Sequence, residues 1–212
     1  MNFKRSLSPD DLVLMEHNES TRIDLAYARD DNLLFGEQIY KSDAQLWLHK
    51  DLARVVELAA QRCFERNRIR FVLYDGLRTI EAQEAMMQTQ RVRDNPHWLE
   101  EPRMLSPAGS GGHPRGMAID IGLEDMDGQL LDMGCPFDCM DERAHRNYKH
   151  SETVQYHRGI LDNAMLEAAQ SAGVELVLLA EEWWDFRFPK AVYNMFSPLS
   201  DQELPKKMRQ IS

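Results

Sequence analysis

The sequence has no long hydrophobic run, few cysteines and no excess of basic residues, and each absence excludes a class of protein. No apolar stretch approaches the roughly 20 residues that a transmembrane helix needs, so we expect no membrane span. The 3 cysteines are an odd number for a disulfide framework and fit a reducing compartment. The net charge of -10 argues against nucleic acid as a partner, because phosphate binding requires a basic surface.

The amino-terminal residues also lack the apolar segment of a secretory signal, since Lys4 and Arg5 are followed by polar residues. Together with the cysteine content, this predicts a cytoplasmic protein. Hydrophobic residues make up 43% and charged residues 28% of the chain, which is ordinary for a soluble globular protein. A chain of 212 residues can bury one core, so we expect a single domain over residues 1–212. Nothing in the sequence indicates an oligomeric state.

The spacing of apolar residues predicts three helices. We expect them over residues 44–66 with Asp43 as N-cap, over 80–93 after Thr79, and over 160–172 before Gly173. Residues 94–112 and 132–156 show no periodicity and are expected to be irregular.

Short β-branched, aromatic or alternating runs predict the strands. They cover residues 70–76, 116–123, 174–179 and 182–188. In the second of these, Asp120 shares a small, polar face with Ala118 and Gly122. An Asp-Gly pair at 127–128 predicts a hairpin turn. Helices first, then strands mixed with a later helix, indicate an α+β fold: a single domain with a mainly antiparallel sheet and flanking helices.

Two motifs contain the residue types of a metal-dependent hydrolase. In the first, His113 follows two glycines and Asp120 stands seven positions after it. The second motif is Glu181-Glu182-Trp183-Trp184-Asp185. Imidazole and carboxylate groups bind zinc, and a further carboxylate can act as a general base. Taken singly, each residue also fits an ordinary alternative, a surface histidine or an exposed carboxylate on an acidic chain.

The order of four separated blocks resembles that of the D-Ala-D-Ala dipeptidases, which are zinc enzymes related to the D,D-carboxypeptidases of cell-wall peptidoglycan metabolism. The blocks are Tyr74-Asp75-Gly76-Leu77-Arg78, His113 to Asp120, Met133-Gly134 with Phe137-Asp138, and Glu182-Trp183-Trp184. The similarity extends upstream to Asp24-Leu25-Ala26-Tyr27-Ala28 and Asp31-Asn32, so it covers most of the chain. Four blocks in the same order are more specific than any one of them.

The resemblance implies a role for most of the matched residues. His113 and Asp120 match two zinc ligands. Glu182 matches the general base, which takes a proton from the attacking water and later protonates the leaving amine. Arg78 matches the arginine that stabilises the developing charge on the scissile carbonyl.

Three further residues are candidate substrate contacts. Asp138 and, less closely, Tyr27 match groups that hold the free amino terminus of a dipeptide; the alternatives are a turn carboxylate and a packed tyrosine. The family has a serine two positions before the first histidine, where this chain has Gly111, with Ser110 one step earlier. We therefore include Ser110 among the substrate-binding candidates. Trp183 and Trp184 are expected to pack in the core.

The third metal ligand departs from the family, which places histidine where this chain has Asp185. A zinc ion with one aspartate and two neutral histidines has a net charge of about +1, whereas a second aspartate brings it to about zero. Lewis acidity should then fall, and oxygen-rich ligation makes manganese or iron more competitive. A working Asp185 ligand and a lost metal site both remain open, as does substitution by His145, His150 or His157. The presence of all the other matched groups favours a retained metal.

The resemblance therefore predicts a metal-dependent dipeptidase with one zinc ion that hydrolyses a short peptide, D-Ala-D-Ala by family. The first alternative is an impaired or inactive family member that binds a small peptide or a protein partner in the same cleft. The second is an enzyme of altered chemistry that acts on another amide. We expect neither nucleic acid nor a membrane as partner.

Overall fold

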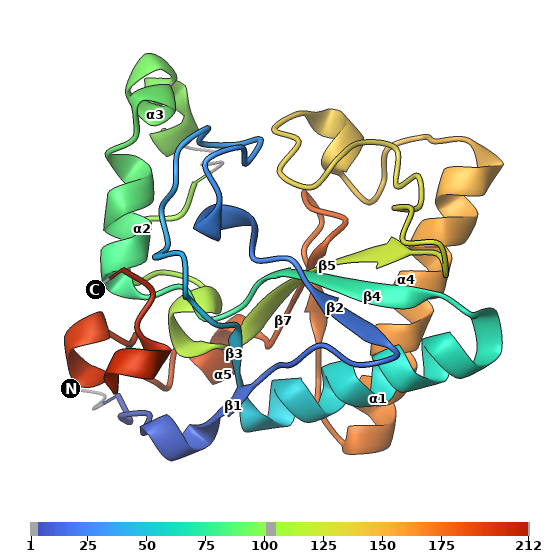
Figure 1. The fold of residues 1–212 in the computed structure, drawn as a ribbon, viewed down its shortest axis with the longest axis horizontal. Helices are drawn as coiled ribbons and strands as arrows, with labels where there is room; N and C mark the ends of the chain where they lie inside the picture. The colour runs from blue at the N-terminus through green and yellow to red at the C-terminus, as the bar shows by residue number, and fades with distance from the viewer. Residues whose placement is uncertain (1–3, 101–104, 212) are drawn as a thin grey trace.

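Five strands form the central sheet, in the order β2-β4-β5-β7-β6 (Figure 1). The computed structural model describes residues 4–100 and 105–211. The strands of this sheet are β2 (Thr21–Ile23), β4 (Arg70–Asp75), β5 (Ala118–Glu124), β6 (Val177–Leu178) and β7 (Asp185–Arg187). β2 is parallel to β4, and the other neighbours are antiparallel. A separate antiparallel pair joins β1 (Leu12–Leu14) to β3 (Trp47–His49). The predicted α+β fold with a mainly antiparallel sheet is confirmed.

The two longest helices, α1 (Lys50–Asn67) and α4 (Glu152–Ala172), pack against each other and against the sheet (Figure 1). Val56 of α1, Leu161 of α4 and Ile119 of β5 are fully buried in this core. The shorter helices are α2 (Ile80–Met87), α3 (Gln90–Asp94) and α5 (Lys190–Tyr193). Single 3-10 turns lie at Pro9–Asp11, Ala26–Ala28, Pro96–Leu99, His113–Arg115, Glu142–Ala144, Asp201–Glu203 and Lys206–Met208.

The first predicted helix begins later than expected. Residues Trp47–His49 form β3, and α1 starts at Lys50 with His49 as its N-cap, so the prediction of a helix from residue 44 capped by Asp43 is wrong. His49 Nδ1 accepts a hydrogen bond from the backbone N–H of Asp51 at 3.3 Å. The reason is tertiary: β3 obtains backbone partners from β1, which overrides the local helical spacing.

The last long helix starts earlier than expected, at Glu152 with Ser151 as N-cap, whereas its end before Gly173 is predicted correctly. Apolar spacing does not reveal the first turns of α4, because a charged residue, Arg158, is among the side chains buried there. Its guanidinium donates hydrogen bonds to the backbone carbonyls of Met133, Arg143 and His145. A charged side chain can be buried when it forms hydrogen bonds with backbone carbonyls, and the spacing of hydrophobic residues does not predict such burial.

Other boundaries also differ from the prediction. The helix expected over 80–93 is divided into α2 and α3, and residues 96–99 form a 3-10 turn inside an expected loop. The strands β6 and β7 are shorter than the predicted runs. Residues 101–104 of the expected loop lie outside the described residues. The hairpin turn is confirmed, because Gly128 N donates to Asp125 O at 3.1 Å.

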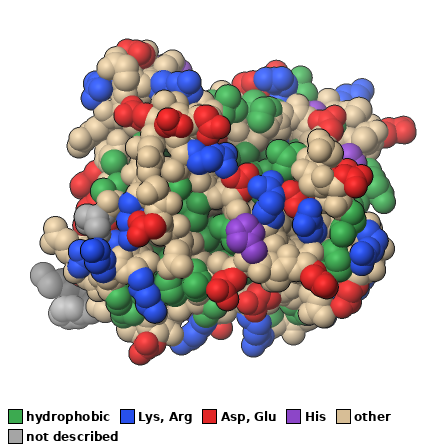
Figure 2. All heavy atoms as spheres, in the orientation of Figure 1, with side chains coloured by type: hydrophobic (Ala, Val, Ile, Leu, Met, Phe, Trp, Pro, Cys, Tyr) green, Lys and Arg blue, Asp and Glu red, His purple; other side chains and the backbone are tan. Residues whose placement is uncertain are grey.

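All seven residues of β5 are buried, so Asp120 does not stand on a solvated strand face. Trp183 and Trp184 are buried in the core as expected, and the three cysteines are buried free thiols. Among the described residues, no helix has both the length and the apolar character needed to cross a membrane. On the face shown in Figure 2, basic and acidic side chains are interspersed and form no continuous basic stripe.

Candidate active site

Three aspartates stand side by side on three neighbouring strands. Asp75 of β4 is opposite Asp120 of β5, and Asp120 is opposite Asp185 of β7. An irregularity in the β4–β5 ladder between Leu73 and Asp75 brings Asp75 into this row. The three side chains are almost completely buried. Like charges directly opposite each other in a sheet are destabilising, so the row requires cations around it.

His113 reaches the row from a short turn before β5. Buried Arg115 holds this turn by donating to the backbone carbonyls of Gly109 and Gly111. The turn ends at Gly116, which has φ +61, and a Cβ there would lie 2.9 Å from the backbone nitrogen of His49. Only glycine fits that position without strain.

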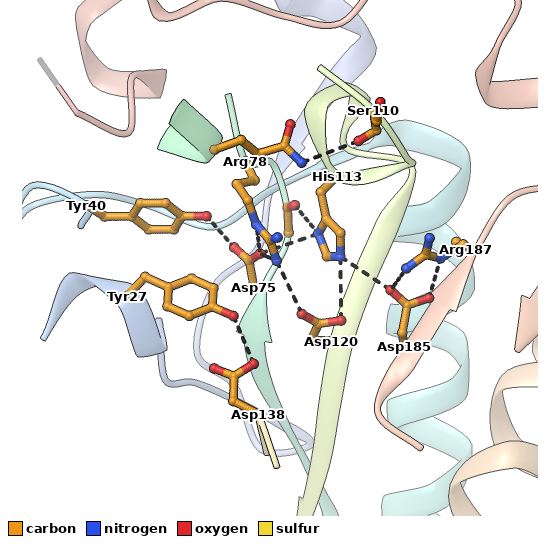
Figure 3. A network of polar contacts seen from close by, with 12 residues as sticks. Tyr27, Tyr40, Asp75, Arg78, Ser110, His113, Asp120, Asp138, Asp185 and Arg187 are labelled. Carbon is orange, nitrogen blue, oxygen red and sulfur yellow. Dashed lines mark hydrogen bonds and ion pairs between the residues drawn. The ribbon is translucent and has the colours of Figure 1, made fainter. Parts of the chain in front are cut away.

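One ring nitrogen of His113 points toward β4, near Asp75, and the other toward Asp120 and Asp185 (Figure 3). Nδ1 lies 2.9 Å from the carbonyl oxygen of Gly76, which can only accept, so Nδ1 carries a proton. Nε2 lies 3.5 Å from Asp120 Oδ1 and 3.3 Å from Asp185 Oδ2. Although burial opposes protonation, Asp120 and Asp185 raise the pKa of His113 to about 10. A proton therefore occupies Nε2 where a metal cation would compete for it.

The donor atoms fit a divalent cation. Among the described residues, two groups have ligand atoms within 4.8 Å of one another: Asp75, His113 and Asp120, and Asp120, Glu182 and Asp185. Asp75 and His113 Nδ1 are engaged elsewhere, so the donors that remain are His113 Nε2, Asp120, Asp185 and Glu182. Of these, His113 Nε2 lies near both Asp120 and Asp185. Asp120 Oδ1 is buried without a hydrogen-bond partner, as expected for an oxygen that awaits a cation. None of His145, His150 and His157 belongs to either group.

Asp75 connects Arg78 to His113. Its Oδ1 accepts a hydrogen bond from Tyr40 at 2.7 Å, and its Oδ2 accepts from Arg78 Nε at 2.8 Å and Nη2 at 2.5 Å. The same Oδ2 lies 3.4 Å from His113 Nδ1. Asp75 belongs to one of the matched sequence blocks, but the sequence alone predicted no role for it. Its position three residues before an arginine, at the end of a buried strand, was the available signal.

Arg78 lines a pocket together with Tyr27 and Asp120. Its Nη2 is 3.8 Å from Asp120 Oδ2, and its guanidinium lies 5.4 Å from the ring centre of Tyr27. Bound to Asp75 on one side, it presents its remaining donors to the pocket. A fixed guanidinium of this kind can stabilise a developing negative charge.

Asp138 and Tyr27 form a second polar pair in the same pocket (Figure 3). The hydroxyl of Tyr27 donates to Asp138 Oδ1 at 3.0 Å, while Asp138 Oδ2 is buried without a hydrogen-bond partner. Burial, with the nearby charge of Asp120, raises the pKa of Asp138 well above its ordinary value. An ammonium group bound at Oδ2 would satisfy this oxygen.

Glu182 lines the pocket close to the aspartate row. Burial is the largest cause that raises its pKa to about 8, followed by repulsion from Asp185 and Asp120. A carboxyl group with a pKa near neutrality is suited to accept and return protons. Ser110 also lines the pocket, where its side chain is exposed and its backbone carbonyl accepts from Gln83 at 3.3 Å. Seven of the eight predicted site residues thus line one pocket, and the eighth, Asp185, is fully buried next to His113.

Asp185 has a partner that the sequence interpretation did not include. Arg187 Nε donates to Asp185 Oδ1 at 2.5 Å, and Arg187 Nη2 donates to Oδ2. The two residues are two positions apart on β7, so their side chains share one face of the strand. That spacing was the signal in the sequence.

Comparisons with known proteins agree with these features. Residues 7–201 match the family described as D-ala-D-ala dipeptidase, Peptidase M15. The D-alanyl-D-alanine dipeptidase of Escherichia coli is 31% identical over 185 residues, covering 85% of this chain and 84% of that protein. The D-alanyl-D-alanine dipeptidase of Enterococcus faecium is 28% identical, covering 78% and 84%. The L-Ala D-Glu endopeptidase ChiX of Serratia marcescens is 17% identical, with a TM-score of 0.42, and the match covers 69% of this chain and 84% of that one. The family match over most of its length shows that the chain belongs to the D-Ala-D-Ala dipeptidase family.

Proposed function

We propose that this protein is a metal-dependent dipeptidase and that D-Ala-D-Ala is its substrate. The observation that carries this proposal is the convergence of His113 Nε2, Asp120 and Asp185 beside Glu182 in one pocket. Family membership supports it, since both relatives named above are D-alanyl-D-alanine dipeptidases.

The three ligands would hold one zinc ion, with manganese or iron as alternatives because two of the ligands are carboxylates. When bound, the ion would polarise the scissile carbonyl as a Lewis acid. It would also lower the pKa of the attacking water, so that hydroxide is available at neutral pH. Nδ1 of His113 is already held by Gly76, which orients Nε2 for this role.

The remaining residues have roles that follow from their positions. Glu182 takes the proton from the attacking water and returns it to the leaving amine. Arg78 stabilises the oxyanion that forms on the scissile carbonyl. Asp138, oriented by Tyr27, binds the free amino terminus of the substrate, and a carboxylate there favours very short peptides. Ser110 is a further substrate contact at the edge of the pocket.

The test is a D-Ala-D-Ala hydrolysis assay of the full chain, with alanine release measured after addition of zinc, manganese or iron. We expect about one metal per chain and activity that a chelator removes. Glu182→Gln should lower kcat by at least about 100-fold, because the proton acceptor is lost. Glu181→Gln, a change in the exposed neighbouring glutamate, is the matched control and should retain activity. No hydrolysis with any of the metals, or equal activity in both variants, would refute the proposed function.

A further inference from the structure

We propose that Asp185 and Arg187 act as one unit that replaces a neutral histidine ligand, with the arginine cancelling the additional negative charge of the aspartate. This inference rests on the proposed metal site and assigns to Arg187 a role in setting its charge. Arg187 is a positioning residue in this scheme, since it acts through Asp185.

Arg187 and Asp185 form a bidentate ion pair. Arg187 Nε and Nη2 each donate to a different oxygen of Asp185, the first at 2.5 Å. The Asp185 side chain is 0% exposed and that of Arg187 is 16% exposed, so water screens the pair only weakly. Arg146 Nη2 also donates to the backbone carbonyl of Asp185 at 3.0 Å, which fixes the strand at this point. The carboxylate is therefore held in one orientation, with Oδ2 3.3 Å from His113 Nε2.

This orientation leaves Asp185 able to bind a cation. An ionised carboxylate offers about four lone-pair sites on its two oxygens, and Arg187 uses one on each. The remaining site of Oδ2 faces His113 Nε2, 3.3 Å away, where a cation would replace the Nε2 proton. The arginine engages the carboxylate without excluding it from the ligand set.

The sum of the charges around the proposed metal site supports a joint role for Asp185 and Arg187. Asp120 with two neutral histidines would contribute about -1 to a bound metal, and Asp120 with Asp185 contributes about -2. The guanidinium of Arg187 is always protonated and returns the sum to about -1. The sequence-based expectation of a neutral, weakly Lewis-acidic centre counted only the ligands. With Arg187 included, the net charge around zinc is again about +1.

The other nearby arginines have different partners. Arg78 is bound to Asp75 at the opposite end of the row, and Arg146 forms an ion pair with Asp162. The loop before His113 approaches the guanidinium of Arg187: a Cβ on Gly111 would lie 4.0 Å from Arg187 Nη1, an ordinary van der Waals distance. Nη1 thus faces the loop before His113, and a competing role for it is binding a substrate carboxylate.

A double-mutant cycle separates these roles, with zinc affinity as a readout independent of turnover. Asp185→His alone places a histidine beside an uncompensated guanidinium, so the zinc Kd should increase by about tenfold or more. Adding Arg187→Gln to Asp185→His should restore the zinc Kd to within a few-fold of the native value. Arg187→Gln alone should retain zinc but lower kcat by about tenfold or more, because the centre becomes less Lewis-acidic.

The matched control is Arg66→Gln in the Asp185→His background. Arg66 pairs with Glu167 between α1 and α4, so this change removes the same charge away from the pocket and should give no recovery. Circular dichroism and thermal unfolding of every variant identify any that do not fold, and Arg187→Met is a second neutral replacement of similar length.

Three results would overturn the inference. If Arg187→Gln changes the zinc Kd by the same factor in the native protein and in the Asp185→His variant, residues 185 and 187 are not coupled. If it raises KM in both backgrounds without altering the zinc Kd, Arg187 binds substrate instead. If neither the native protein nor the double variant binds zinc, manganese or iron, the metal site itself is wrong and the proposed function fails with it. Zinc binding without coupling refutes this inference alone.

Discussion

Asp75 contacts both Arg78 and His113 of the candidate site. It is 0% exposed and receives hydrogen bonds from Tyr40 and Arg78, while its Oδ2 lies 3.4 Å from His113. A buried carboxylate that accepts several hydrogen bonds fixes the geometry of its donors. Asp75 therefore positions both the guanidinium proposed to stabilise the oxyanion and the imidazole proposed to bind the metal.

Asp75→Asn should lower kcat/KM for D-Ala-D-Ala by about 10- to 100-fold, because an amide cannot accept both bonds from Arg78 with the strength of a carboxylate. Zinc affinity should fall as well, since His113 loses part of its orientation. Asp11→Asn is the control, because Asp11 pairs with Lys50 in a similar way far from the pocket. Unchanged kinetics in Asp75→Asn would mean that Gly76 and Tyr27 are sufficient to hold His113 and Arg78.

Tyr27→Phe tests the proposed amino-terminal subsite. The change removes the 3.0 Å hydrogen bond to Asp138 and preserves the packed ring. A net hydrogen bond of about 1 kcal/mol corresponds to roughly a five-fold rise in KM, with kcat changed less. Steady-state kinetics of D-Ala-D-Ala, compared with a peptide lacking the free amine, measure this. A selective loss of kcat would place Tyr27 in the chemical step instead.

At the residue scale, the sequence predicted the candidate ligands but not the charged groups that contact them. His113, Asp120 and Glu182 occur in recognisable motifs, and the structure brings them together. Asp75 and Arg187 were missed because their importance depends on a neighbour across the sheet or along one strand face. The position of Asp75 also depends on a ladder irregularity after Leu73, and no local pattern encodes such a shift.

At the scale of elements, the turn that carries His113 is locked onto the strand β3. His49 N donates to Gly116 O at 2.7 Å, and a Cβ at Gly116 would approach the same nitrogen to 2.9 Å. The peptide carrying this glycine therefore both ends the turn and contacts the neighbouring element. The position of His113 depends on this close backbone approach.

Gly116→Ala should reduce the free energy of unfolding by at least about 2 kcal/mol, because it adds a backbone clash to the cost of a positive φ. Gly173→Ala is the matched control: Gly173 has φ +69 but faces open space, so only the conformational cost of about 1 kcal/mol applies. Urea unfolding curves of both variants measure the difference. Equal losses would show that the turn yields to the new methyl group.

His49 makes the start of α1 sensitive to pH. Burial is the largest influence on this side chain and lowers its pKa from 6.5, against the attraction of Asp51 and Asp11. The unfolded chain then binds the proton more readily, so this group's contribution to stability falls as pH drops below about 6.5. Protonation also removes the Nδ1 acceptor of the helix cap.

His49→Asn keeps a capping acceptor and removes the titration. Between pH 7.5 and 5.5, the native protein should therefore lose more stability than the variant, by up to about 1 kcal/mol for the cap. The difference between the two proteins isolates His49 from His113, whose raised pKa acts in the opposite direction. If urea unfolding shows the same loss of stability with pH in both proteins, His49 is not the source of that loss.

Element types were predictable where one physical signal dominated. The buried strand β4 and the glycine-terminated end of α4 follow directly from apolar runs and capping. The boundary at residue 50 was not predictable, because β3 owes its strand conformation to pairing with β1. Local spacing cannot show that a distant segment supplies backbone partners.

At the scale of the whole molecule, the sheet brings together three carboxylates that repel one another. Asp75, Asp120 and Asp185 come from positions far apart in the sequence and meet through strand register. Arg78 and Arg187 neutralise the two ends of the row, while Asp120 in the middle has a buried oxygen without a partner. Protonated His113 lies beside Asp120 and Asp185, so a bound cation would displace the Nε2 proton and take over the charge balance at the centre of the sheet.

Zinc should consequently raise the thermal unfolding temperature of the native protein. A ligand at about 100 times its Kd adds about 2.7 kcal/mol to the folded state. For a chain of this length, 1 kcal/mol corresponds to about 2–4 °C, so we expect an upward shift of about 5–10 °C that a chelator reverses. Differential scanning calorimetry with and without zinc measures it. His113→Ala keeps the three aspartates but removes the imidazole ligand, so its shift should be much smaller. If this variant is stabilised as strongly as the native protein, His113 is not a zinc ligand, because carboxylates alone then suffice to bind the ion.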